Sequence, residues 1–168
     1  MISINNILVA TDFQPASDNA LRYARALAGR FGARLHVLHV TTDVYLGAAS
    51  AYGYSGVPVT LQQDIEAAAL KQTEALLTDE ERRTRQAVAT TVTAGSPAAA
   101  IVDYAAREEI DLLVLGTHGR GALSHLLMGS VAERVVRMAP CPVLTVRHPE
   151  HEFVLPDTAL VAATAPNR

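Results

Sequence analysis

The chain has 168 residues, of which 49% are hydrophobic and 18% are charged. This length suffices for one well-buried core and is too short for two ordinary domains. The net charge of −3 excludes a general positive field for nucleic acid or anionic lipid, so any bound anion must be held by local geometry. The sequence has no leader of signal type, no apolar run of membrane-spanning length and a single cysteine, so we expect a cytoplasmic protein without disulfides or membrane partners.

Apolar patterns in the first part of the chain predict strands alternating with helices. A short apolar run over 4–10 predicts a strand buried on both faces. Apolar residues at helical spacing predict a helix over 15–31, ended by Gly32. A second strand is expected over 35–40, and the Gly-, Ala- and Tyr-rich residues 41–58 predict a long loop.

The middle of the chain continues the alternation. A helix is predicted over 61–76, becoming polar around 79–85. Its expected apolar positions are Leu61, Ile65, Ala68, Ala69 and Leu76. Residues 88–93 alternate as a third strand, and Ser96-Pro97 predicts a helix start with serine as N-cap and proline at the first helical position.

The last part of the domain contains two further predicted strands, over 112–115 and 143–146. A glycine-rich loop follows the first of them, and a last helix begins near Ser130 and ends at Pro140. Ser130 and Glu133 have the spacing of a capping box.

The alternation predicts an α/β fold: a single domain with a five-stranded parallel sheet and helices on both faces, Rossmann-like. Right-handed crossovers place every strand-to-helix loop at one edge of the sheet, where ligands bind at the point at which strand order reverses. We therefore expect Thr11-Asp12, Val40-Thr41 and the loop at Gly116 to lie together.

The glycine loop predicts a phosphate-binding cradle, because backbone N–H groups can surround an anion where side chains do not obstruct its approach. It is not a Walker A loop, since the only lysine is Lys71, and it lacks the spacing of the dinucleotide fingerprint. The pattern that fits is G-x2-G-x9-G-[ST], met by Gly116, Gly119, Gly129 and Ser130.

On these residues the chain resembles universal stress proteins of the ATP-binding branch, which carry this glycine motif on an adenine nucleotide alpha hydrolase-like fold. The resemblance covers residues 1–147 as one domain and leaves the tail 148–168 outside the family pattern. Besides the glycine motif, the resemblance rests on the segments 7–13, 111–121, 127–132 and 139–144. It implies a homodimer formed through the strand 143–146, which would remove an exposed sheet edge.

The same resemblance implies the ATP-binding residues. They are Ala10, Thr11, Asp12, Val40, Gly116, Thr117, His118, Gly119, Arg120, Gly129, Ser130 and Val131. Residues 10–12 would hold adenine and ribose, Val40 the adenine edge, residues 116–120 the α- and β-phosphates, and residues 129–131 a phosphate at a helix N-terminus. Mg²⁺ would be held mainly by phosphates and water, since no carboxylates are spaced to build a site.

Structural alternatives stand beside these roles. Ser130 could cap its helix, with or without binding phosphate. Asp12 could be a turn residue or an N-cap ahead of the first helix. His118 is better suited to a hydrogen bond than to acid–base chemistry, and Arg120 could bind phosphate or lie in solvent.

His36 and His39 lie three apart on a strand and therefore face opposite sides, which makes them poor metal ligands as a pair and favours core or solvated roles.

Three functions remain open. The first is a cytoplasmic ATP-binding stress-response protein in which nucleotide modulates a dimer or its partners; without an evident base or metal triad, at most slow hydrolysis is expected. The second is an ATP-using enzyme of related fold, which the first strand-to-helix turn does not favour. The third is a dimeric interaction module that has lost nucleotide binding.

Overall fold

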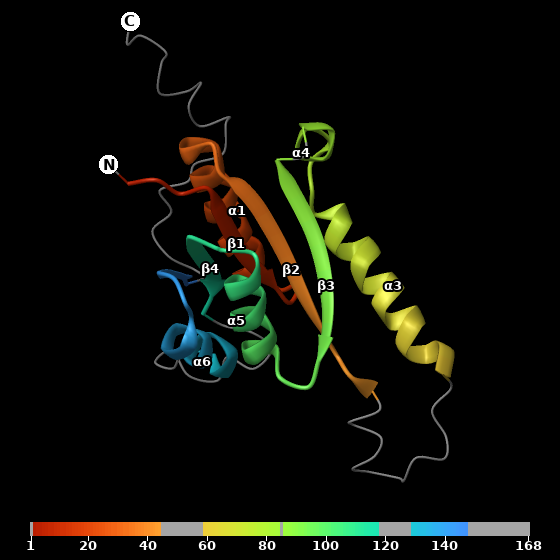
Figure 1. The fold of residues 1–168 in the computed structure, drawn as a ribbon. Helices are drawn as coiled ribbons and strands as arrows, with labels where there is room; N and C mark the ends of the chain where they lie inside the picture. Colours follow the sequence, from red (N-terminus) through yellow and green to blue (C-terminus); the bar gives the residue numbers. More distant parts are fainter. Residues whose placement is uncertain (1, 45–58, 85, 118–128, 148–168) are drawn as a thin grey trace, which may run out of the picture.

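A computed structural model of the chain describes residues 2–44, 59–84, 86–117 and 129–147. In this part of the chain five parallel strands form one sheet in the order β3-β2-β1-β4-β5, with helices on both faces (Figure 1). The bounds are β1 Asn6–Thr11, α1 Pro15–Phe31, β2 Arg34–Thr42, α3 Val59–Ala75, α4 Asp79–Thr84, β3 Ala87–Ala94, α5 Pro97–Arg107, β4 Leu112–Gly116, α6 Ser130–Met138 and β5 Val143–Val146. The predicted α/β fold class is confirmed.

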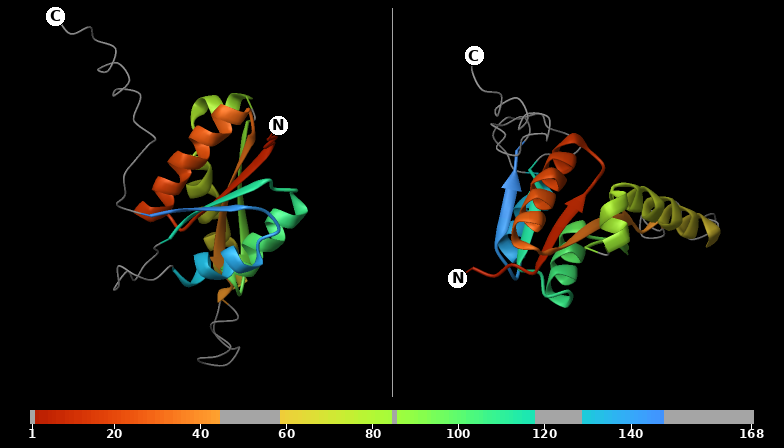
Figure 2. Two further views of the ribbon diagram at one scale, coloured as in Figure 1. Left: turned by 90° about the vertical axis from the view of Figure 1, so that its left-hand side faces the viewer. Right: turned by 90° about the horizontal axis from the view of Figure 1, so that it is seen from above.

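Two buried clusters hold the helices on the sheet. Strand residues alternate between them, so that Ile7 and Val9 belong to one cluster and Leu8 to the other. We call the first the α1-side core, because it contains the inner face of α1, and the second the α5-side core, because it contains the inner faces of α5 and α6. Figure 2 shows α1 and α5 on opposite sides of the sheet.

Local signals fix several helix ends as expected. Gly32 ends α1 with a φ of 67°, a left-handed conformation that costs glycine little. The Ser96 side chain accepts a hydrogen bond from the Ala99 amide, and Pro97 occupies the first turn of α5. None of the described helices is long and apolar enough to cross a membrane.

Helix α3 differs from the predicted pattern. Leu61 and Ala68 are exposed, although their spacing predicts an apolar inner face, whereas Gln62 and Thr73 are buried. Gln62 donates to the Thr93 hydroxyl (3.3 Å), and Thr73 contacts Thr91 (3.5 Å), because the end of β3 that α3 covers is rich in threonine. The polar segment after α3 is a separate helix, α4.

The strand register brings distant segments to one edge of the sheet. Strand order reverses between β1 and β4, which pair with Ala10 opposite Leu115. On its other side β1 pairs with β2, with Thr11 opposite His39. Strand β2 continues to Thr42, so Thr41 belongs to the strand rather than to the predicted loop. The carboxyl ends of β1, β2 and β4 therefore lie side by side.

Candidate functional site

The residues that follow β1 form a turn in which side chains satisfy the backbone. The amide of Phe13 donates to the Thr11 hydroxyl (3.0 Å), and the amide of Gln14 donates to an oxygen of Asp12 (3.2 Å). The buried Ser17 hydroxyl lies 3.2 Å from the Thr11 hydroxyl and from the Gln14 nitrogen. Three short polar side chains thus stabilise the path from β1 into α1.

Asp12 stabilises the turn after β1, as one of its two predicted structural roles requires, and one of its carboxylate oxygens can still accept a hydrogen bond. Its Oδ1 atom accepts the Gln14 amide. The N-cap of α1 is Gln14, so Asp12 is not the cap. Among the described residues no hydrogen bond is recorded to Oδ2, which leaves that oxygen able to accept a hydroxyl group.

Gly116, the last residue of β4, is required for packing. A Cβ atom built there would lie 2.6 Å from the Ala16 carbonyl oxygen and 2.9 Å from the Ser17 nitrogen, both backbone atoms of the first turn of α1. Any residue with a Cβ atom at this position would require that helix to shift. The glycine at this motif position is therefore explained by the contact with α1.

The N-terminus of α6 is attached to the end of β4. The Gly129 amide donates to the Thr117 carbonyl over 2.6 Å, and the Thr117 amide donates to the Val146 carbonyl over 2.9 Å. Thr117 is buried, whereas Ser130 and Val131 are exposed in the first turn of α6. Gly129, Ser130 and Val131 are thus brought beside the point at which strand order reverses.

The predicted capping box at Ser130 is wrong. The N-cap of α6 is Gly129, no side chain of the described residues caps the helix, and Ser130 is its first helical residue. Glu133 instead forms an ion pair with Arg137 at 3.0 Å, one turn further along α6. The contact of Gly129 with Thr117 places the cap one residue earlier than the sequence spacing indicates.

Helices α1 and α6, which follow β1 and β4, differ in how well their N-terminal ends can bind an anion. The Ser17 hydroxyl and Asp12 carboxylate occupy the N-terminal end of α1, and a carboxylate there repels an anion. Among the described residues no side chain caps α6, so its first N–H groups and its dipole favour an anion.

Ala10 and Val40 lie on the same side of the sheet as α6. Both are half-buried and pack against the α5-side core. The side chain of Thr11 follows the alternation to the opposite face, where it meets Ser17. An apolar strip at the ends of β1 and β2 therefore lies on the face that carries the uncapped helix.

His118, Gly119 and Arg120 lie outside the described residues. The other predicted site residues lie at the ends of β1, β2 and β4 and in the first turn of α6. The structure brings these segments together.

Sequence reasoning missed two aromatic residues beside the site. Phe13 has a φ of 59°, and its ring lies against that of His39, with centroids 4.3 Å apart. Nδ1 of His39 lies 2.8 Å from the carbonyl oxygen of Thr11. The alternation of β2 places His36 and His39 on opposite faces, as predicted, and gives His36 a core role against Tyr104 (3.0 Å). Only the strand register reveals that His39 meets the end of β1.

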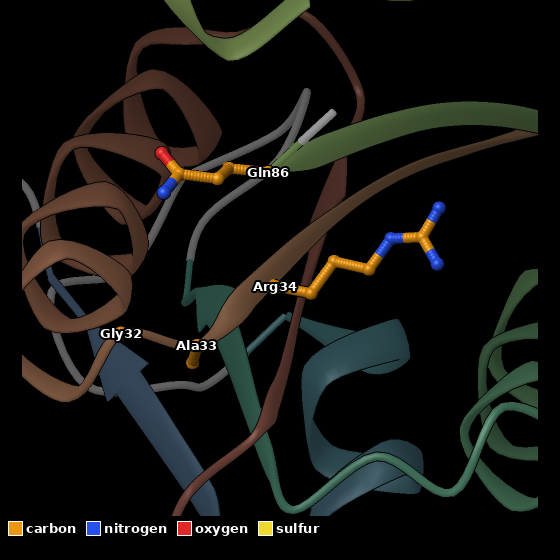
Figure 3. A pocket seen from close by; sticks show the side chains of 4 residues that line it. All are labelled: Gly32, Ala33, Arg34 and Gln86. Atoms are coloured by element: carbon orange, nitrogen blue, oxygen red, sulfur yellow. The ribbon is translucent and has the colours of Figure 1, made fainter. Parts of the chain in front are cut away.

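The described residues form no metal cluster at this edge, and a pocket that they do form lies at the opposite edge of the sheet. Within the described ranges no three His, Cys, Asp or Glu side chains are grouped so that they could hold a metal ion. This shallow hollow lies at the amino-terminal ends of β2 and β3 and is lined by Gly32, Ala33, Arg34 and Gln86 (Figure 3). The Arg34 and Gln86 side chains point in different directions, so this hollow presents no convergent polar groups.

Comparison with known proteins agrees with the glycine motif. The sequence model of the Universal stress protein family matches residues 3–147. A universal stress protein of Methanocaldococcus jannaschii is 32% identical over 147 residues, covering 87% of this chain and 84% of the relative.

Solved structures agree as well. Universal stress protein UspA from Lactobacillus plantarum has a TM-score of 0.66 and 30% identity, covering 88% of this chain and all of that one. A universal stress protein from Archaeoglobus fulgidus, solved in complex with dAMP, covers 87% of this chain and 99% of its own length with a TM-score of 0.54. At 21% identity this last likeness shows the fold alone. The family match and the close relative together show that the chain belongs to the universal stress protein family.

Proposed function

We propose that this protein is a cytoplasmic ATP-binding stress-response protein that holds the nucleotide at the carboxyl edge of β1, β2 and β4. The observation that carries the proposal is the N-terminus of α6, which no side chain of the described residues caps and which the hydrogen bond from Gly129 to Thr117 holds beside the end of β4. Phosphate at this helix end would accept backbone N–H groups and meet the favourable end of the dipole. A universal stress protein from Archaeoglobus fulgidus that shares this fold was solved in complex with dAMP, and we propose an adenine nucleotide as the ligand class here as well.

The other contacts of the nucleotide are inferred from the face of the sheet on which each residue lies. Adenine would lie against the apolar strip of Ala10 and Val40, on the same side of the sheet as α6. The second carboxylate oxygen of Asp12 would accept sugar hydroxyls. Gly116 and Thr117 form the floor beneath the phosphates, and residues 118–120 would complete the cradle. Mg²⁺ would be coordinated by phosphate oxygens and water.

The proposed site retains the nucleotide or hydrolyses it slowly. Asp12 is the carboxylate of the β1 turn, and one of its oxygens is already engaged by the Gln14 amide. Catalysis of phosphoryl transfer needs a positioned water or base together with charge stabilisation on the transferred group. Within the described part of the edge, the groups present are suited to binding.

A second copy of the chain would pair through β5. This strand is the last in the sheet order, and its outer edge offers backbone donors and acceptors to the same strand of another chain. Sedimentation of the protein with and without ATP tests whether the nucleotide modulates the dimer. A change in the dimer constant supports the regulatory part of the proposal, and identical constants at saturating ATP contradict it.

A module that dimerises without nucleotide is the competing function. It is favoured by one observation, the packing role of Gly116, because that glycine does not require a phosphate. Titration of nucleotide-stripped protein with ATP and Mg²⁺ in a calorimeter separates the two. Saturable binding near one ATP per chain supports the proposed function; the absence of binding up to millimolar ATP favours the dimeric module.

A further inference from the structure

The turn after β1 is held from the face opposite the proposed nucleotide. His39 and Val40 are successive residues of β2, so their side chains lie on opposite faces of the sheet. Val40 packs against the α5-side core, on the same face as α6, and His39 therefore projects to the α1 side. His39 reaches the turn from behind and does not face the proposed nucleotide.

The hydrogen bond of His39 acts on the residue that leads into Asp12. A carbonyl oxygen only accepts, so the contact of 2.8 Å requires the proton of His39 to be on Nδ1. This bond fixes the peptide group between Thr11 and Asp12, at the point where the chain leaves the strand. The amides of Phe13 and Gln14 are fixed in turn by the Thr11 hydroxyl and the Asp12 carboxylate.

The Phe13 ring lies against His39, and Phe13 adopts an unfavourable backbone conformation in this position. Its φ of 59° lies in the left-handed region that bulky side chains rarely adopt. Its ring lies 4.3 Å from the His39 ring, at an interplanar angle of 34°. Uncommon backbone conformations persist where the surroundings hold them, and they concentrate at binding sites. The ring contact and the hydrogen bond of His39 together supply such surroundings here.

We infer that His39 and Phe13 are positioning residues that orient Asp12 toward the sugar hydroxyls of the bound nucleotide. This inference rests on the proposed function, because it assigns the role to the same site. Asp12 uses Oδ1 to accept the Gln14 amide, and the orientation of the turn determines where Oδ2 points. His39 acts through the Thr11 carbonyl and does not touch the nucleotide.

Two substitutions at position 39 separate the hydrogen bond from the ring contact. In His39→Asn the side-chain Nδ2 occupies the same bonded position as Nδ1 of histidine, so the bond to Thr11 is retained without the ring. His39→Leu keeps apolar bulk and loses the donor. Both variants remove the aromatic ring that lies against Phe13, and they differ chiefly in whether a donor to the Thr11 carbonyl remains.

The readout is the preference for ATP over 2′,3′-dideoxy-ATP, measured by calorimetric titration of variants whose circular dichroism matches wild type. A hydroxyl bound to a carboxylate gives wild type about a tenfold preference or more. Because His39→Asn loses the ring contact but keeps the donor, we expect it to retain an intermediate preference for ATP, at least about twofold above that of His39→Leu, which we expect to fall to about twofold or less. A purely structural role would weaken both nucleotides equally and leave the preference unchanged.

Phe13→Gly provides a second test if His39→Leu does not fold. Glycine adopts the positive φ readily, so this change removes the ring while relieving the backbone. A reduced preference in Phe13→Gly supports the inference.

Each opposite result overturns the inference. An unchanged ATP preference in folded His39→Leu or Phe13→Gly contradicts the positioning role alone. Equal binding of the two nucleotides by wild type shows that Asp12 does not select the sugar. Absence of ATP binding by wild type refutes the proposed function itself and the inference with it.

Discussion

The Gly129 amide and the Thr117 carbonyl are joined by a hydrogen bond of 2.6 Å that fastens the start of α6 to the end of β4. With this contact Gly129 is the N-cap, and no side chain in the described part of the chain caps the first turn of α6. The polar groups of that turn are therefore available to a ligand at the point where strand order reverses.

Ser130→Ala separates phosphate binding from helix capping. Because Ser130 is not the cap, the free energy of unfolding should change by no more than about 0.5 kcal/mol, whereas loss of a serine cap costs ~1 kcal/mol. If the hydroxyl binds phosphate, ATP affinity should fall about three- to tenfold. Urea denaturation and calorimetric titration of the same samples measure both quantities. A loss of stability with unchanged affinity would restore the capping role.

Gly116→Ala should destabilise the fold. The added Cβ would meet the backbone of Ala16 at 2.6 Å, and the first turn of α1 must shift to admit it. We expect a loss of about 1–3 kcal/mol in the free energy of unfolding, the usual cost of overpacking. Chemical denaturation measures this directly. Unchanged stability would show that the close contact between β4 and α1 is not maintained in solution.

His36 should make folding stability depend on pH. Burial, supported by the charge of Arg34 and opposed by Glu108, lowers the pKa of His36 below 6.5. Its Nδ1 atom is 3.0 Å from the Tyr104 hydroxyl, and among the described residues its buried Nε2 atom has no hydrogen-bond partner. Because the unfolded chain takes up this proton at a higher pH than the folded chain, stability should fall as the pH drops below about 6.5.

The measurement is the urea midpoint between about pH 7.5 and 5.5, compared with His36→Gln. The variant removes the titrating group and should show a smaller loss of stability across this range. Parallel pH profiles for the two proteins would mean that His36 does not cause the loss.

The fold was predictable because its signals are local. Apolar runs define the buried strands, and Gly32, Ser96 and Pro97 define helix ends through their own backbone preferences. The inner face of α3 was less predictable, because Gln62 and Thr73 are buried by contacts with threonines of β3 that a hydrophobic period does not reveal.

The candidate site was predictable in its placement and less so in its chemistry. Strand alternation indicated which ends meet, but the cap of α6 depends on a tertiary contact with Thr117 and was wrongly assigned to Ser130. The link from His39 to Thr11 depends on the register of β1 with β2. A strand histidine carries no local signal of such a partner.

The most direct test of phosphate binding at α6 is to titrate ATP and Mg²⁺ into nucleotide-free wild type and Gly129→Val under identical conditions. Gly129 has φ −56° and ψ 145°, a conformation open to any L-residue, so the backbone admits valine, and we expect its side chain to fill the space that a phosphate needs at the helix end. We predict equal thermal stability and a loss of at least about tenfold in ATP affinity, equivalent to ~1.4 kcal/mol. Equal ATP affinity in the two folded proteins would contradict the assignment.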